Sequence, residues 1–169
     1  MAITQVEFDF KLKVTETIAL GVDSLTDQTY YPQIATDTSS GTKTPTTQVP
    51  CTTQWQDTFS LSAGAATLTL TALSFGNLAA KDLTGLKVQF IKIRNRSTNT
   101  AAVTIVDGAA NGYNILGDAS GQITMPVGST FMFGMDTTEG LQDVAAGDAT
   151  IDFSSSDVDA TVDVQIIAG

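Results

Sequence analysis

Apolar side chains return at every second position along most of this chain. In the first such run, Val6, Phe8, Phe10, Leu12 and Val14 alternate with residues that are mostly charged. A period of two places successive side chains on opposite faces of an extended strand, so this strand has one apolar and one polar face. A chain patterned in this way is constrained to bury one face of each strand in a sheet-based core.

The same alternation recurs in short segments as far as the C-terminus, among them 54–62, 86–95 and 161–166. Turn signals such as Asp107-Gly108 and Asn111-Gly112 separate the segments, at the spacing of about 8 to 12 residues that is typical of sandwiches and barrels. The polar positions are rich in Thr, which suits strands better than helices. We therefore predict an all-β, antiparallel β-sandwich with about ten strands and little or no helix. Periodicity does not fix strand order, so a jelly roll and an immunoglobulin-like sandwich both stay open.

Two details of the pattern make local predictions. The apolar parity switches at Phe90-Ile91, which indicates either a β-bulge or a strand buried on both faces. Trp55 shares its parity with Phe59 and Leu61, so we expect its ring in the core rather than on a binding face.

Residues 21–54 depart from the pattern, because Asp, Thr, Ser, Gln, Gly and Pro dominate them. A polar stretch of this length is unusual inside a compact domain. It is either an ordered excursion that contacts a partner or a mobile loop, and its aromatic residues favour contact in its front half. We predict one domain over 1–169 with this long polar excursion, and contacts with partners mainly through residues 1–54. The predicted interface residues are Val6, Phe8, Tyr30, Tyr31 and Ile34.

Composition and charge exclude several classes of function. The net charge is −10, and no Lys or Arg follows Arg96. Such a surface should repel nucleic acid, and it either serves solubility or forms an acidic outer face opposite a neutral docking face. The chain has no His, which excludes a Ser-His-Asp centre and a His-ligated metal. A single cysteine, Cys51, excludes an internal disulfide framework. We expect no secretory signal and no membrane span.

Acidic residues offer two further kinds of chemistry, and neither is favoured. A calcium site at Asp157-Val158-Asp159, with Asp163 nearby, lacks the further oxygen ligands of an EF-hand loop, so we expect a solvated turn there. Glycoside hydrolysis needs two convergent carboxylates, and alternation alone does not bring any pair together. We therefore predict no enzyme activity, no cofactor and no metal. The carboxylates considered for hydrolysis are Asp57, Asp107, Asp118 and Asp152.

The C-terminal half resembles a known group of proteins. Its strand ends in Ile91-Lys92-Ile93-Arg94-Asn95, a Met125-Pro126-Val127-Gly128 step precedes an aromatic strand, and the last strand closes on Ile166-Ile167-Ala168-Gly169. In these features Leu86–Gly169, about half of the chain, resembles the small jelly-roll or β-sandwich structural proteins of tailed-bacteriophage virions. The resemblance implies a jelly-roll-like decoration, cement or fibre-base protein, often trimeric, that assembles on a capsid or tail.

These considerations lead to one hypothesis and one alternative. The hypothesis is a non-enzymatic capsid decoration or cement protein that is assembled in the host cytoplasm and located on the virion. Its partners would be further copies of itself, with a trimer favoured, and a major capsid protein or another virion protein. The alternative is a carbohydrate- or receptor-binding β-sandwich module of a phage tail or fibre, with Tyr30, Tyr31 or Tyr113 as exposed contacts.

Overall fold

A computed structural model describes residues 6–9, 12–14, 28–30, 40–43, 52–75, 78–108, 110–117, 121–134 and 141–169. Within these ranges the chain forms β-strands and turns and no helix, as predicted. None of these residues belongs to a helix long and apolar enough to cross a membrane. The strands are β1 (Val6–Asp9), β2 (Leu12–Val14), β3 (Gln28–Tyr30), β4 (Ser40–Lys43), β5 (Thr53–Ser60), β6 (Ala65–Thr69), β7 (Leu73–Phe75), β8 (Leu78–Lys81), β9 (Val88–Asn95), β10 (Val103–Asp107), β11 (Gln122–Met125), β12 (Thr130–Gly134), β13 (Thr150–Ser155) and β14 (Thr161–Ala168).

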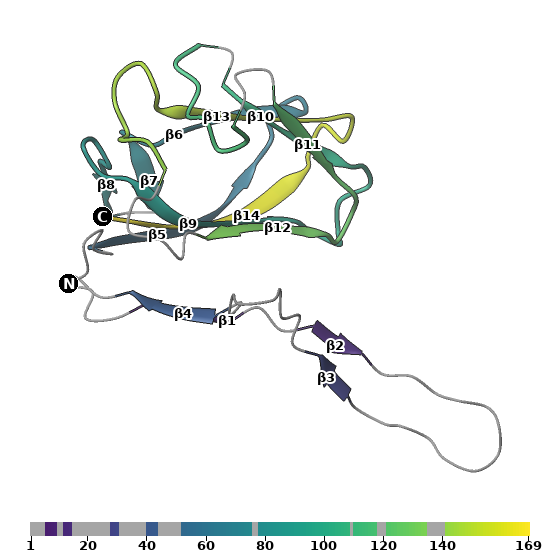
Figure 1. Cartoon of the computed structure of the whole chain (residues 1–169). Coiled ribbons are helices and arrows are strands. Elements are labelled where there is room, and N and C mark those ends of the chain that lie inside the picture. The colour runs from purple at the N-terminus through teal and green to yellow at the C-terminus, as the bar shows by residue number, and fades with distance from the viewer. Residues whose placement is uncertain are drawn as a thin grey trace.

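Eight of these strands form two four-stranded antiparallel sheets that face each other (Figure 1). One sheet, which we call the β5 sheet, has the order β12-β9-β14-β5, and the other, the β6 sheet, has the order β11-β10-β13-β6. Four connections, from β5 to β6, β9 to β10, β11 to β12 and β13 to β14, each pass from one sheet to the other. This interleaved strand order is that of a jelly roll, so the predicted antiparallel sandwich is confirmed and the choice left open by periodicity is settled.

The hydrophobic core lies between the two sheets, where alternate residues of each strand are buried. Trp55 is 3% exposed, and its indole Nε1 donates a hydrogen bond to the Ser74 carbonyl at 2.7 Å. The ring of Phe59 on β5 meets that of Phe153 on β13 edge to face, with centroids 5.1 Å apart. Such a pair adds to the stability given by burial alone. The prediction that Trp55 is a core residue is confirmed.

A β-bulge interrupts the pairing of β9 with β14. Ile167 lies opposite Phe90, but the next residue, Ala168, lies opposite Val88. The extra residue is Gln89, one position before the parity switch, so the predicted bulge is confirmed. Gln89 is 1% exposed, and neither its Oε1 nor its Nε2 has a hydrogen-bond partner among the described residues.

The first alternating run forms two strands rather than one. β1 pairs with β4 in one two-stranded sheet, and β2 pairs with β3 in another. Neither ribbon joins a sheet of the sandwich, and in Figure 1 both are drawn below the sandwich, beyond the β5 sheet. The polar stretch 21–54 thus contributes β3 and β4, in addition to the start of β5.

Two segments of the sandwich differ from what the sequence predicts. The turn residues Gly76-Asn77 and Thr84-Gly85 predict a connection over 76–85, but this segment contains β8, which pairs with β7 as an antiparallel hairpin. The sequence also predicts a short strand over 113–116, but this segment forms no strand. The backbone before it folds tightly, since a Cβ on Gly112 would lie 2.4 Å from the Gly108 carbonyl oxygen. This fold places Tyr113 inside the sandwich, fully buried. Its hydroxyl accepts a hydrogen bond from the Val88 amide at 3.1 Å and donates one to the Gln142 carbonyl at 2.7 Å.

Candidate docking surface on the beta5 sheet

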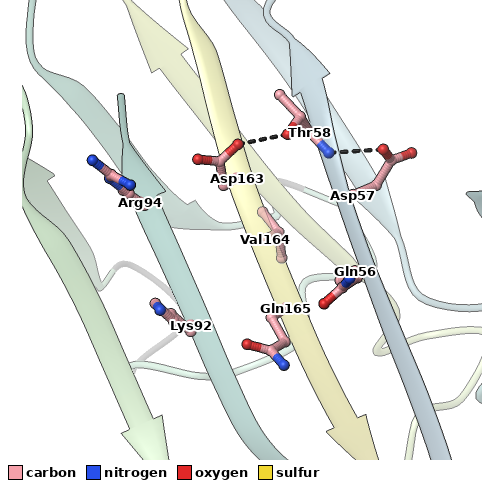
Figure 2. A pocket seen from close by; sticks show the side chains of 8 residues that line it. All are labelled: Gln56, Asp57, Thr58, Lys92, Arg94, Asp163, Val164 and Gln165. Carbon is pink, nitrogen blue, oxygen red and sulfur yellow. Dashed lines mark hydrogen bonds between the residues drawn. The ribbon is translucent and has the colours of Figure 1, made fainter. Parts of the chain in front are cut away.

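A groove with a volume of ≈ 440 Å³ runs over strands β5, β14 and β9 of the β5 sheet (Figure 2). Seven of its eight lining residues are polar or charged, and they come from three neighbouring strands rather than from a loop. Rigid strands hold side chains in place more closely than loops do. The lining residues are Gln56, Asp57, Thr58, Lys92, Arg94, Asp163, Val164 and Gln165.

The strand register arranges these side chains in rows. Asp163 lies opposite Arg94 on one side and Thr58 on the other. Directly paired residues of adjacent strands share a face of the sheet, so these three side chains form one row on the outer face. Gln165 lies between Lys92 and Gln56 in the next row.

Hydrogen bonds and one ion pair hold the acidic side chain of the first row. The Asp163 carboxylate accepts a hydrogen bond from the Thr58 hydroxyl at 2.5 Å and pairs with Arg96, whose Nε lies 3.0 Å from Oδ1. Arg96 therefore compensates the charge of Asp163. Asp57 and Asp163 also line the groove, but Lys92 and Arg94 have no acidic partner among the described residues. The β9 side of the groove is therefore positively charged on a chain of net charge −10.

An apolar border continues the second row onto the edge strand β12. Met132 lies opposite Lys92 and is 39% exposed, which makes it one of the most exposed large apolar side chains among the described residues. Further along, Phe90 is partly exposed and lies opposite Ile167, which is only 7% exposed. The surface thus combines cationic, amide and apolar groups, a composition suited to binding a protein surface.

The carboxylates considered for hydrolysis do not converge. Asp57 lies at the groove on β5, whereas Asp152 lies on β13 of the other sheet and accepts a hydrogen bond from the Thr67 hydroxyl at 2.6 Å. Asp107 is 2% exposed, and its Oδ1 accepts a hydrogen bond from the Ile115 amide. Asp118 lies outside the described residues. No group of three or more His, Cys, Asp or Glu side chains suited to a metal occurs in the part of the chain that the structure describes.

Asp157 and Asp159 lie in the turn between β13 and β14, where the sequence predicts a turn. The Asp157 carboxylate accepts hydrogen bonds from the Thr100 amide at 2.7 Å and the Asp159 amide at 3.2 Å. Hydrogen bonds from Thr100 above all lower the pKa of Asp157. The carboxylate therefore shapes this turn.

The predicted interface residues fall into two groups. Val6 and Phe8 lie in β1 and Tyr30 in β3, whereas Tyr31 and Ile34 lie outside the described residues. Their role as contacts stays a prediction. Tyr113 is buried, which corrects the expectation that it could form an exposed sugar contact.

Of the groove residues, only Asp57 and Asp163 were considered as candidates from the sequence, and for other kinds of chemistry. Charged and amide residues at alternate positions are typical of any solvated strand face, and their partners on β14 and β5 are distant in the chain. The signal that could have found them is the run Lys92-Ile93-Arg94-Asn95-Arg96, which places three cations at alternate positions just before the basic residues cease.

Comparisons with known proteins add little to this description. No family model and no curated protein matches the chain. One solved structure that is similar comes from work on Bacillus endospore appendages, described as a novel family of disulfide-linked pili. The similarity has a TM-score of 0.40 at 18% sequence identity, and it covers 69% of this chain and 83% of that chain. The fold assignment given above rests on the strand order alone.

Proposed function

We propose that this protein is a non-enzymatic structural component of a bacteriophage virion, of the capsid decoration or cement type. It binds the particle through its N-terminal ribbons and associates with further copies through its jelly-roll sandwich. The jelly roll is a recurrent fold of viral capsid proteins, and this fold-level analogy adds to the resemblance of residues 86–169 to phage structural proteins.

The observation that carries the proposal is the separation of the β1–β4 and β2–β3 ribbons from the two sheets. A jelly roll needs eight strands, and β5 to β14 already provide them. An isolated two-stranded ribbon is at best marginally stable in water. The ribbons are therefore suited to pack against a partner, because this contact would supply the buried area that a two-stranded sheet lacks.

The proposal is tested by substitution of Thr42, which lies in β4 opposite Glu7 of β1. Proline at this position removes a backbone donor and disfavours the ribbon, whereas Thr42→Val keeps the donor and the β-branched shape. Each variant is produced in the cells that make the particles, and density-gradient fractions of the lysate are probed with an antibody against the chain. We expect the native chain and Thr42→Val to sediment with the particles and Thr42→Pro to stay in the soluble fractions.

Two results would contradict the proposal. The native chain would be absent from every particle fraction, or Thr42→Pro would sediment with particles as fully as Thr42→Val. The urea midpoint of the sandwich should be the same in both variants, which separates a lost contact from a lost fold.

The carbohydrate-binding alternative uses a different readout. Jelly rolls are also common among lectins, but the eight groove residues include no aromatic ring for stacking on a sugar. Binding of the native chain to a glycan array, lost on substitution of Tyr30 but not of Thr42, would favour that alternative over particle binding.

A further inference from the structure

Four of the connections between the sheets lie together at one end of the sandwich. They span residues 61–64, 96–102, 126–129 and 156–160, and each follows a strand that runs toward this end and precedes one that runs away from it. We call this set the loop end. The opposite end holds the start of β5 and the end of β14, where the Thr52 amide donates a hydrogen bond to the Ala168 carbonyl at 2.9 Å.

A pair of buried asparagines joins three of these loops. Asn95 Nδ2 donates hydrogen bonds to the carbonyls of Ala101 and Met125, at 3.2 and 2.9 Å. Asn99 Nδ2 donates to Asn95 Oδ1 at 2.6 Å and to the Thr161 carbonyl at 2.7 Å, and Asn99 Oδ1 accepts from the Thr161 amide at 2.9 Å. Asn95 is fully buried and Asn99 is 8% exposed. Networks of satisfied buried polar groups hold the surrounding structure in one arrangement.

Backbone contacts bring in the fourth loop and fix the outermost turn. The Gly64 amide donates to the Val158 carbonyl at 3.2 Å, and the Ser155 amide donates to the Gly64 carbonyl at 2.8 Å. A Cβ on Gly64 would lie 2.3 Å from the Ser155 carbonyl oxygen, so only glycine allows this approach. The turn over 156–160 is therefore held by backbone contacts with Gly64 as well as by hydrogen bonds to the Asp157 carboxylate.

This supported turn displays a specific pattern of side chains. Val158 is 56% exposed, the highest value among the large apolar side chains of the described residues. It stands between Asp157, which is half-buried, and Asp159, which is exposed. Single exposed apolar side chains are common on protein surfaces, so Val158 is of interest here only together with the two carboxylates beside it and the contacts that hold its turn. We call Asp157-Val158-Asp159 the acidic tip.

We propose that the acidic tip of one copy docks into the groove of a second copy. The tip offers two carboxylates around a valine, and the groove offers Lys92 and Arg94 beside the exposed Met132. The carboxylates of the tip therefore meet the cations of the groove. The exposed side chains of Val158 and Met132 bury each other in the same contact. A second copy is the occupant favoured by charge, because Lys92 and Arg94 lack an acidic partner within the described part of their own chain.

The contact joins two different surfaces, so each copy carries one tip and one groove. A head-to-tail contact of this kind closes into a ring when its rotation allows, which agrees with the trimer that the phage resemblance implies. The inference rests on the proposed structural role for its purpose, but the contact itself depends on the sandwich and not on the N-terminal ribbons.

The test measures self-association of the full chain by analytical ultracentrifugation. Reversal of both groove cations, Lys92→Glu with Arg94→Glu, should weaken association at least about tenfold, because close interfacial charge pairs contribute strongly. The matched control is Lys87→Glu, which reverses one cation at the other end of β9 and should leave association unchanged. Raising the salt from about 0.05 M to about 1 M should also weaken association of the native chain.

A charge exchange gives the decisive result. Asp159→Arg should weaken association of the chain with itself, whereas Asp148→Arg, at a turn away from the tip, should not. Combining Asp159→Arg with Arg94→Glu in one chain should restore association, since positions 159 and 94 then again carry opposite charges while Asp157 and Lys92 are unchanged. Asp159 is chosen because the Asp157 carboxylate accepts the hydrogen bonds that hold the turn, whereas the Asp159 carboxylate accepts none within the described part of the chain.

Three outcomes would overturn the inference. They are a native chain that is monomeric at every concentration, a groove variant that associates as strongly as Lys87→Glu, and a combined variant without restored association. If Thr42→Pro abolishes association while the groove variant does not, the occupant is the N-terminal region of another copy. Loss of particle binding by Thr42→Pro, with association intact, would leave the proposed function standing whatever the groove variants show.

Discussion

Asn99 is the side chain whose removal should disturb the loop end most. Alanine at this position removes two hydrogen bonds donated by Nδ2 and two accepted by Oδ1. It leaves Asn95 Oδ1 and the amide, carbonyl and hydroxyl groups of Thr161 without these partners. A buried polar group left unpaired costs about 1–3 kcal/mol. Thr161 is half-buried, so water can replace some of the lost hydrogen bonds. We therefore expect the substitution to lower the free energy of unfolding by about 2–4 kcal/mol in total.

Urea unfolding of the native chain and of Asn99→Ala measures this difference in the free energy of unfolding. Thr98→Ala is the matched control, because Thr98 is exposed in the same loop and should change stability by less than about 0.5 kcal/mol. Faster hydrogen exchange at the Thr161 amide should accompany the loss. If Asn99→Ala costs less than about 1 kcal/mol and leaves that exchange rate unchanged, the loop end does not depend on these bonds and our account of it is wrong.

Three further perturbations test other parts of the structure. Burial raises the pKa of Tyr113 from 10.0 to about 12. Because the folded-state pKa is the higher one, the contribution of Tyr113 to folding stability is intact below pH 10 and is lost between pH 10 and about pH 12. Alkaline unfolding of Tyr113→Phe should therefore lack the component that the native chain shows in that window. Gly112→Ala should cost about 1–3 kcal/mol by urea unfolding, since its Cβ would meet the Gly108 carbonyl, whereas Gly147→Ala, with open space around it, should be near neutral. The pKa of Asp157 is lowered in the folded state, so its contribution to stability is present above the unfolded-state pKa near 3.8 and is lost as the pH falls below that value. NMR signals of the acidic tip should therefore change on acidification before the core unfolds.

The sequence identified strands where alternation was continuous and local. The pattern around Trp55, the parity switch next to Gln89 and the final strand were all interpreted correctly, because burial on one face of a strand leaves a trace at every second residue. Strand order left no such trace. The pairing of β14 with both β9 and β5 joins segments far apart in the chain, and only the folded structure shows that the order is that of a jelly roll.

The functional surface was less predictable than the fold. Tyr113 follows an Asn-Gly turn signal, and the carbohydrate-binding alternative named it as one possible exposed contact, yet tight packing of the turn carries its ring into the core. Lys92 and Arg94 resemble any solvated face until the register places Gln165 and Asp163 beside them. Val158 stands out only once its neighbours are known to be hydrogen-bonded, since an exposed valine in a flexible loop would have no significance.

The hydrogen bond from the Thr52 amide to the Ala168 carbonyl has a practical consequence for fusion proteins. It holds the segment that enters β5 next to the residue that completes β14, at the end of the sandwich opposite the loop end. A fluorescent protein or peptide joined after β14 would therefore emerge on the side of the N-terminal ribbons (Figure 1), where steric interference should be greatest. If the fluorescent protein or peptide is instead inserted at the exposed turn around Gly147, it labels the sandwich without lying beside those ribbons.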